Sequence, residues 1–325
     1  MFFKSLRLSL MLFSGCILLA AISSNNLPGQ DASKKTENSQ LPARISDQTY
    51  RISVDLVNVF CSVFDKNTNS FVTTLTEQDF DVYEDDQLQE IKNFVRETNL
   101  PLTVAMLVDT SESVGPKLKF EQEAAIAFFQ SILRDEDDRA MLVEFDSSVN
   151  LLQDFTSDPN KLAKAIRKLK AAGGTALYDA IYVTCDEKLI REVGRKAIII
   201  LSDGNDTSSK RSLRSATEMA LRAEATIFSI SVTKGGYFGV GSDDEGDPIL
   251  KDLAEETGGK KFSPFKIEDL DENFREINQE LRSQYNIGYF SSNPVRDGSY
   301  RKIKIKVKEG GLKLRYRRGY YAPTN

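Results

Sequence analysis

The central part of the chain alternates long apolar runs with amphipathic segments. The nearly continuous apolar runs predict strands at Thr103–Val108, Ala140–Phe145, Lys196–Leu201 and Thr226–Val232. The segments between and after them repeat apolar residues at helical spacing and predict helices at Lys117–Leu133, Pro159–Ala171, Leu177–Glu192, Arg211–Ala223, Pro248–Thr257 and Ile267–Leu281. Strands without polar alternation are buried on both faces. We therefore expect an α/β domain with a doubly wound, mostly parallel sheet and helices on both faces.

In the two segments that flank this region, apolar residues recur at every second position. Val57, Val59, Cys61 and Val63 share one strand face, and a similar alternation returns after Gln284. This pattern is typical of short antiparallel strands with one buried face. The most economical arrangement is one small antiparallel β-sandwich built by both flanking segments. Cys61, and Cys185 on a helical stripe, are expected to be core residues rather than disulfide partners.

The first residues have the layout of a secretory signal peptide. Lys4 and Arg7 precede the uncharged run Leu8–Ile22, and Ala21-Ile22-Ser23 resembles a cleavage site. The run is shorter than the roughly 20 residues that span a bilayer, although a retained anchor is the alternative. Cys16 lies in an imperfect lipoprotein box, and lipidation is the less favoured interpretation. We expect an exported protein, in the periplasm, at the cell surface or secreted.

These patterns divide the chain into predicted parts. They are a signal peptide at 1–24, a flexible linker at 25–48, an N-terminal β-sandwich segment at 49–99, the α/β domain at 100–283 and a C-terminal β segment at 284–325 that completes the sandwich.

Composition restricts the chemistry. The 325 residues include no histidine and no tryptophan, and the three cysteines have no CxxC spacing. Histidine-dependent catalysis, histidine-bound zinc and cysteine-bound metal are therefore excluded. The formal net charge of −5, from 43 basic and 48 acidic residues, disfavours a general nucleic-acid binder. A bound metal would need oxygen ligands, which suits Mg²⁺, with Mn²⁺ and Ca²⁺ as alternatives.

Oxygen-bearing side chains gather in three segments at predicted loops. Asp109-Thr110-Ser111-Glu112-Ser113 follows the first buried strand, Gly173-Gly174-Thr175 precedes a helix, and Ser202-Asp203-Gly204 ends another strand. Ligands of an open parallel sheet bind at the carboxyl ends of its strands. We expect the segments to converge on one hard cation. The candidate ligands are Asp109, Ser111, Ser113, Thr175 and Asp203, and the residues that shape the site are Gly173, Gly174 and Gly204.

The motifs DTSES, GGTALYDA and LSDGND, in this order, resemble the metal-ion-dependent adhesion site of von Willebrand factor A (VWA) domains. The resemblance covers roughly residues 100–283 and implies that Ser111, Ser113 and Thr175 bind the cation directly or nearly so. It also implies that Asp109 and Asp203 often act through water and that a Glu or Asp carboxylate of a partner protein completes the coordination shell. The flanking segments resemble exported VWA proteins of acidobacteria, a group that implies architecture more than function.

The resemblance predicts an exported adhesion or binding protein and no enzyme. We expect no nucleic-acid partner, and membrane contact only through the N-terminal signal or a retained anchor. One alternative is a structural scaffold whose metal stiffens the loops. Another is a metal-dependent phosphohydrolase, which is disfavoured because Ser111 replaces the second carboxylate of a DxD motif and no histidine substitutes for it.

Several nearby motifs have plainer interpretations. Asp179 is expected to be an outer-shell or capping group, Asp206 a solvated loop carboxylate, and Glu112 a residue that points to solvent. The acidic stretch 239–247 lacks the spacing of a calcium loop and predicts a surface loop. The alternating cations of 301–308 predict an antiparallel strand with one solvated face or a lysine-protected edge.

Overall fold

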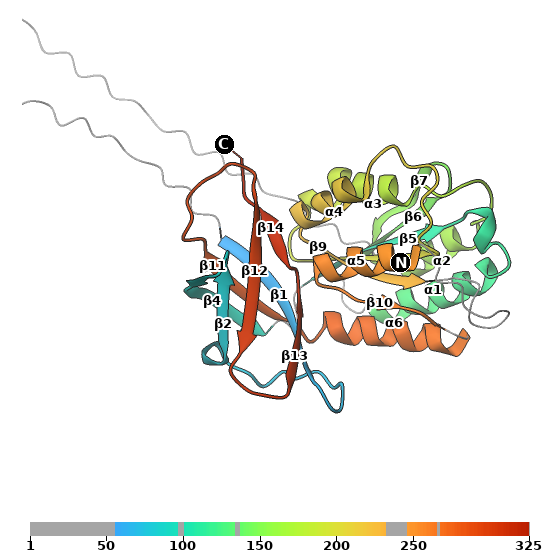
Figure 1. Ribbon diagram of the computed structural model, residues 1–325. Helices are drawn as coiled ribbons and strands as arrows, with labels where there is room; N and C mark the ends of the chain where they lie inside the picture. The colour runs from blue at the N-terminus through green and yellow to red at the C-terminus, as the bar shows by residue number, and fades with distance from the viewer. Residues whose placement is uncertain (1–55, 97–100, 134–136, 232–245, 265–266, 325) are drawn as a thin grey trace, which may run out of the picture. The chain divides into compact units, whose positions relative to one another are not determined.

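The computed structural model describes residues 56–96, 101–133, 137–231, 246–264 and 267–324, with three sheets and six α-helices in this part of the chain (Figure 1). The predicted signal peptide, the linker and most of the 239–247 stretch lie outside these residues. None of the described helices combines the length and apolar character that a membrane span requires.

The largest sheet has six strands in the order β10-β9-β8-β5-β6-β7. Their bounds are β5 Leu102–Asp109, β6 Arg139–Phe145, β7 Val149–Thr156, β8 Arg195–Ser202, β9 Ala225–Ser231 and β10 Lys261–Phe262. Every pairing in this sheet is parallel except that of β7 with β6, which is antiparallel. The central strands β5 and β8 are buried along their whole length, as their nearly continuous apolar sequence predicts.

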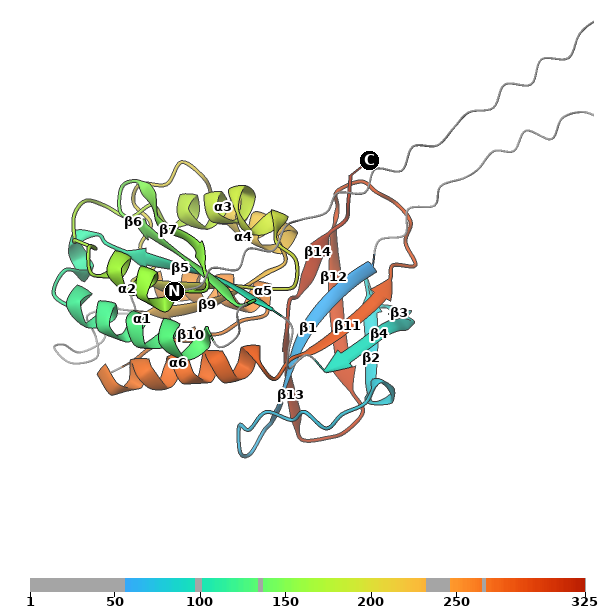
Figure 2. The same ribbon diagram turned by 180° about the vertical axis from the view of Figure 1, so that it is seen from behind.

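Helices cover both faces of this sheet (Figures 1 and 2). They are α1 Leu118–Ile132, α2 Pro159–Ile166, α3 Leu177–Glu187, α4 Leu213–Arg222, α5 Gly246–Thr257 and α6 Ile267–Leu281. Helices α1, α2 and α6 share one apolar cluster with Val104 and Met106 of β5. Helices α3, α4 and α5 share another with Ala105 and Leu107 of the same strand. Alternate residues of one strand therefore face opposite layers, which confirms the predicted fold class.

Some predicted bounds were wrong. Helix α2 ends at Ile166 rather than Ala171. The helix predicted to reach Glu192 ends at Glu187 and is followed by the short 3-10 helix Leu189–Arg191. Strand β7 was not predicted, because it is an edge strand with mixed exposure and has little apolar alternation.

The flanking segments form two four-stranded sheets in the orders β13-β1-β11-β4 and β14-β12-β2-β3. The first contains β1 Leu56–Asp65, β4 Ile91–Arg96, β11 Tyr285–Phe290 and β13 Leu312–Tyr316. The second contains β2 Phe80–Glu84, β3 Gln87–Gln89, β12 Tyr300–Val307 and β14 Gly319–Tyr321. N-terminal and C-terminal strands pair antiparallel in both sheets, β1 with β11 and β13, and β2 with β12. One apolar cluster joins the two sheets, as expected of a β-sandwich.

The lysine-rich strand β12 has one solvated face. Lys302, Lys304 and Lys306 are exposed, whereas Ile303 and Ile305 are buried. Because β12 lies between β14 and β2, it is no sheet edge, and the alternative of a lysine-protected edge is wrong. Cys61 and Cys185 are both buried and free, in agreement with their predicted place in the core.

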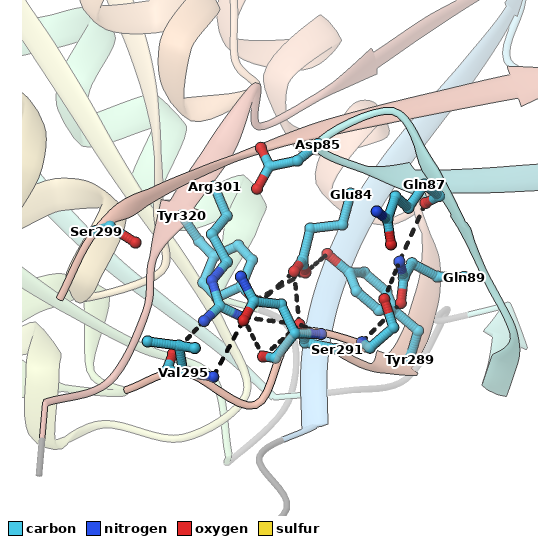
Figure 3. Close-up of polar contacts among 12 residues, drawn as sticks. Glu84, Asp85, Gln87, Gln89, Tyr289, Ser291, Val295, Ser299, Arg301 and Tyr320 are labelled. Carbon is cyan, nitrogen blue, oxygen red and sulfur yellow. Dashed lines mark hydrogen bonds and ion pairs between the residues drawn. The ribbon is translucent and has the colours of Figure 1, made fainter. Parts of the chain in front are cut away.

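A buried polar cluster around Glu84 and Arg301 fixes the loop that contains Asn293 in the β-sandwich (Figure 3). Arg301 Nη1 lies 3.3 Å from Glu84 Oε1, and these residues are only 3% and 2% exposed. The hydroxyls of Tyr289 and Tyr320 donate to Glu84 Oε2 at 3.0 and 2.8 Å. Arg301 also donates to the carbonyl of Asn293 at 2.8 Å. The charges are therefore buried together with hydrogen-bond partners, which is the condition under which a fold tolerates them.

Candidate metal centre

The candidate site lies at the carboxyl ends of β5 and β8. Asp109 is the last residue of β5 and Ser202 the last residue of β8. The two strands are parallel neighbours, and Val108 is paired in register with Leu201. The loops that follow them therefore begin side by side, as ligand-binding loops of an open parallel sheet do.

Asp109 is buried and held by hydrogen bonds from both loops. Its Oδ1 accepts from the backbone N–H of Ser111 at 2.9 Å, and its Oδ2 accepts from the hydroxyl of Ser202 at 2.6 Å. The Ser202 hydroxyl in turn accepts from the N–H of Gly204 at 3.0 Å. Burial raises the pKa of Asp109, the hydrogen bonds from Ser202 and Ser111 oppose that rise, and nearby Asp203 adds to it. The carboxylate is thus fixed in one orientation.

A row of oxygen atoms runs from this buried carboxylate toward solvent. The hydroxyls of Ser111 and Ser113 lie 3.0 Å apart, and Ser113 donates to Asp203 Oδ2 at 2.9 Å. The other oxygen of Asp203, Oδ1, accepts from the N–H of Asn205 at 3.1 Å. Ser111 is buried and Ser113 is exposed. The structure therefore brings Asp109, Ser111, Ser113 and Asp203 into one chain of contacts, with Ser113 as its exposed member.

Thr175 is tied to the loops through its backbone. Its N–H donates to the hydroxyl of Thr207 at 3.0 Å, and its carbonyl accepts from the N–H groups of Thr207 and Ser208, each at 2.9 Å. The second segment also meets the first, because the N–H of Glu112 donates to the carbonyl of Gly173 at 3.2 Å. Thr175 is therefore held by the loop after β8, and within the described residues no hydrogen bond joins its hydroxyl to the oxygen row.

Two of the predicted glycines leave no room for a side chain. A Cβ on Gly174 would lie 2.6 Å from the hydroxyl oxygen of Ser208. Gly204 has a φ of +81°, and a Cβ there would lie 2.4 Å from the carbonyl oxygen of Gly246, the first residue of α5. The loop after β8 can therefore pack against α5 only because glycine stands at this position.

Three neighbouring acidic residues do not belong to the oxygen row. Asp206 accepts from the N–H of Tyr178 at 3.0 Å and from the hydroxyl of Ser209 at 2.6 Å, so the prediction of a solvated carboxylate was wrong. Asp179 accepts from the N–H groups of Lys210 and Arg211 at 3.0 and 2.9 Å, which precede the N-cap of α4 at Ser212, so it holds a loop and caps no helix. Glu112 is exposed, as predicted.

Sequence reasoning missed two residues of this region. Ser202 precedes Asp203 directly and ends an apolar strand, where the sequence alone indicates no role for its hydroxyl. Glu121 is an acidic residue among the inward-facing positions of α1, only 2% exposed, and burial raises its pKa to about 8. The signal for Glu121 was its place in the apolar helical stripe, where a carboxylate is unusual.

Within the described residues, no group of three or more histidine, cysteine, aspartate or glutamate side chains is arranged to hold a metal ion. The candidate site depends instead on serine and threonine hydroxyls together with two aspartates. This donor set contains only oxygen, which hard cations such as Mg²⁺ prefer.

Comparison with known proteins identifies the α/β domain. Residues 104–205 match the sequence model of the von Willebrand factor type A domain, so the chain contains a VWA domain. The chain is also similar to a Synechocystis sp. protein described as uncharacterized protein sll0103, with 31% identity over 111 residues. That match covers 33% of this chain and 26% of the relative, so the chain matches only about a quarter of the relative's length.

Solved structures resemble the chain at lower identity. A von Willebrand factor type A protein from Catenulispora acidiphila is 12% identical, with 86% of this chain and 75% of that chain covered and a TM-score of 0.47. Proximal thread matrix protein 1 from the mussel byssus, solved with a zinc-occupied MIDAS motif, is 16% identical, with 62% and 50% covered and a TM-score of 0.49. These likenesses concern the fold and support no transfer of ligand or metal.

Proposed function

We propose that this chain is an exported binding protein whose VWA domain captures an acidic group of a protein ligand through a divalent cation. Asp109, Ser111, Ser113, Thr175 and Asp203 would hold the cation. The observation that carries this proposal is the row of hydrogen-bonded oxygens, which joins the loop after β5 to the loop after β8 and includes the hydroxyl of the exposed Ser113.

The residues fit a hard divalent cation. The hydroxyls of Ser111 and Ser113, at 3.0 Å from each other, and Asp203 Oδ2, at 2.9 Å from Ser113, are neutral and anionic oxygens close enough to share one ion. The charges of Asp109 and Asp203 both raise the pKa of the buried Glu121, and the positive charge of Lys117 lowers it. This local excess of carboxylates favours a bound cation. We propose Mg²⁺, with Mn²⁺ or Ca²⁺ as substitutes.

Asp109 would stabilise the cation indirectly, without direct contact. Its two oxygens already accept from Ser111 N–H and the Ser202 hydroxyl, which fixes the carboxylate and favours a role through bound water. The neutral hydroxyls of Ser111, Ser113 and Thr175 would leave part of the ion's charge uncompensated. A ligand carboxylate, Glu or Asp, would then complete the shell from the solvent side at Ser113.

The proposal of export rests on the residues before the described part of the chain. The charged start, the apolar run and the small residues of 1–24 support a signal peptide, and 25–48 supports a flexible linker to the folded part. The flanking segments resemble those of exported acidobacterial VWA proteins in sequence, and we propose that the chain is of this type. Under this proposal the ligand is an exported or surface protein.

The test uses N-acetylglutamate as the acidic probe. Mn²⁺-loaded protein is expected to broaden the γ-methylene proton resonances of the probe, because a carboxylate that reaches the paramagnetic ion relaxes rapidly. Ser113→Ala should lose this broadening, and Glu112→Gln, an exposed neighbour in the same loop, should keep it. Mn²⁺ binding without broadening would favour the scaffold function. Phosphoester turnover that is lost in Asp109→Ala would favour the hydrolase.

A further inference from the structure

Glu121 interrupts the apolar stripe of α1. The buried residues of this helix are Leu118, Glu121, Ala124, Ala125, Phe128, Phe129 and Ile132. They recur at intervals of three or four residues and form the face that packs on the sheet. Glu121 is therefore a carboxylic acid at a position where the helix otherwise presents hydrocarbon.

Neither carboxyl oxygen of Glu121 has a hydrogen-bond partner among the described residues. The residue is 2% exposed, so bulk water cannot fully replace the hydrogen bonds that its carboxyl oxygens lack. A buried carboxylate without a partner is strongly unfavourable, and folded proteins rarely keep one without a use for it. The cost cannot be assigned to packing, because leucine or methionine would fill such a position without a buried polar group.

Two of the three charged groups that act on Glu121 belong to the candidate site. Burial is the main cause that raises its pKa, to about 8, and Asp109 at the end of β5 adds to the rise. Asp203, in the loop after β8, raises the pKa further, and Lys117 before α1 opposes these effects. Glu121 thus lies in the electrostatic field of both aspartates of the proposed metal centre and is bonded to neither.

We propose that Glu121 is a proton-linked third carboxylate of the cation site, acting from the buried face of α1 on a cation held by the loops. The inference rests on the proposed function. In the cation-free protein at neutral pH the group is the neutral acid. When a divalent cation binds, its charge favours the carboxylate form, and the acid proton leaves to solvent. Binding of one cation therefore releases about one proton below pH 8.

This linkage makes cation affinity depend on pH. With one proton released per cation, the dissociation constant falls about tenfold for each pH unit up to the pKa of the free protein. Ser111, Ser113 and Thr175 carry no proton that titrates in this range. Asp109, whose pKa burial also raises, lies in the site, so a variant must separate its contribution from that of Glu121.

The test is calorimetric titration of Mg²⁺ into the full chain at pH 7, in two buffers of different ionisation enthalpy. The wild type is expected to release about one proton per Mg²⁺. Glu121→Gln should release none, and its affinity should stay constant between pH 6 and 7.5, where the wild-type dissociation constant falls about thirtyfold. Glu112→Gln, which changes an exposed glutamate of the preceding loop, should behave as the wild type.

The outcomes separate this inference from the function on which it rests. If the wild type binds no divalent cation at any pH, the proposed function fails. If the wild type binds Mg²⁺ without releasing a proton, or if Glu121→Gln releases as many protons as the wild type, the role of Glu121 is overturned and the cation site stands. The proton count of the wild type decides the question even if the variant does not fold.

Discussion

The hydroxyl of Ser202 donates to the carboxylate of Asp109 at 2.6 Å and so joins the ends of β5 and β8 inside the VWA domain. Both residues are fully buried. A bond of this kind orients a carboxylate before any ligand arrives, and groups that orient a metal ligand typically contribute 10- to 100-fold to metal affinity. The site therefore depends on a residue outside the five candidate ligands.

Ser202→Ala is expected to lower the free energy of unfolding by about 1–3 kcal/mol and to weaken Mn²⁺ binding at least about tenfold. Urea unfolding and Mn²⁺ titration measure the two effects. Ser148→Ala is the matched control, because its hydroxyl donates to Asp146 at 2.9 Å in an exposed pair. Equal effects of the two variants would show that the buried bond has no special role.

Gly204→Ala is expected to destabilise the protein by more than about 2 kcal/mol and to weaken cation binding. Alanine adopts a φ of +81° only at a cost of about 1–2 kcal/mol. Its Cβ would also lie 2.4 Å from the carbonyl oxygen of Gly246, so the loop with Asp203 must move. Gly310→Ala is the control, since nothing lies within 4 Å of its Cβ position. A stable Gly204→Ala protein with unchanged affinity would contradict this prediction.

Glu84→Ala in the β-sandwich is expected to cost about 3–5 kcal/mol, because it leaves the Arg301 guanidinium buried without its carboxylate (Figure 3). Tyr289 and Tyr320 would also lose the acceptor of their hydroxyls. Glu90→Ala, which breaks an exposed pair with Lys92, should cost less than about 1 kcal/mol. Chemical denaturation of both variants compares the two pairs. A small loss in Glu84→Ala would mean that the cluster relaxes or admits water.

The cation-free protein is expected to lose stability as the pH rises from about 4.5 to about 8, partly because of Glu121. The folded state raises the pKa of this group, so the folded state binds more protons than the unfolded state in that range. The stabilisation is complete below the unfolded pKa and is lost through the folded pKa, at up to about 1.4 kcal/mol per pH unit. Denaturation curves of the wild type and Glu121→Gln, with chelator present, measure the difference. Parallel pH profiles would contradict it.

The sequence predicted the parts of the fold that strong periodicity encodes. The nearly continuous apolar runs of β5 and β8 and the alternating faces of β1 and β12 have few other structural solutions. Strand β7 was missed because it pairs only with β6 at the edge of the sheet, and its mixed burial leaves no clear alternation.

The site was less predictable than the fold, because distant contacts define it. Sequence order places Asp109, Ser111 and Ser113 in one loop, but only the register of β5 with β8 puts Ser202 next to Asp109. Asp206 resembles a free loop carboxylate in the sequence, yet it accepts from the N–H of Tyr178 at the start of α3. Glu121 was visible in the pattern, but its significance depends on the burial of α1 beside the loops.

The central claim is that the chain of oxygens from Asp109 to Asp203 holds a divalent cation. Its most direct test is calorimetric titration of Mg²⁺ into the wild type, Asp109→Ala and Glu112→Gln, with circular dichroism to verify that each is folded. We predict one saturable site in the wild type and in Glu112→Gln, and loss of that site in folded Asp109→Ala. Undiminished binding in Asp109→Ala, or no binding in the wild type, would contradict the claim.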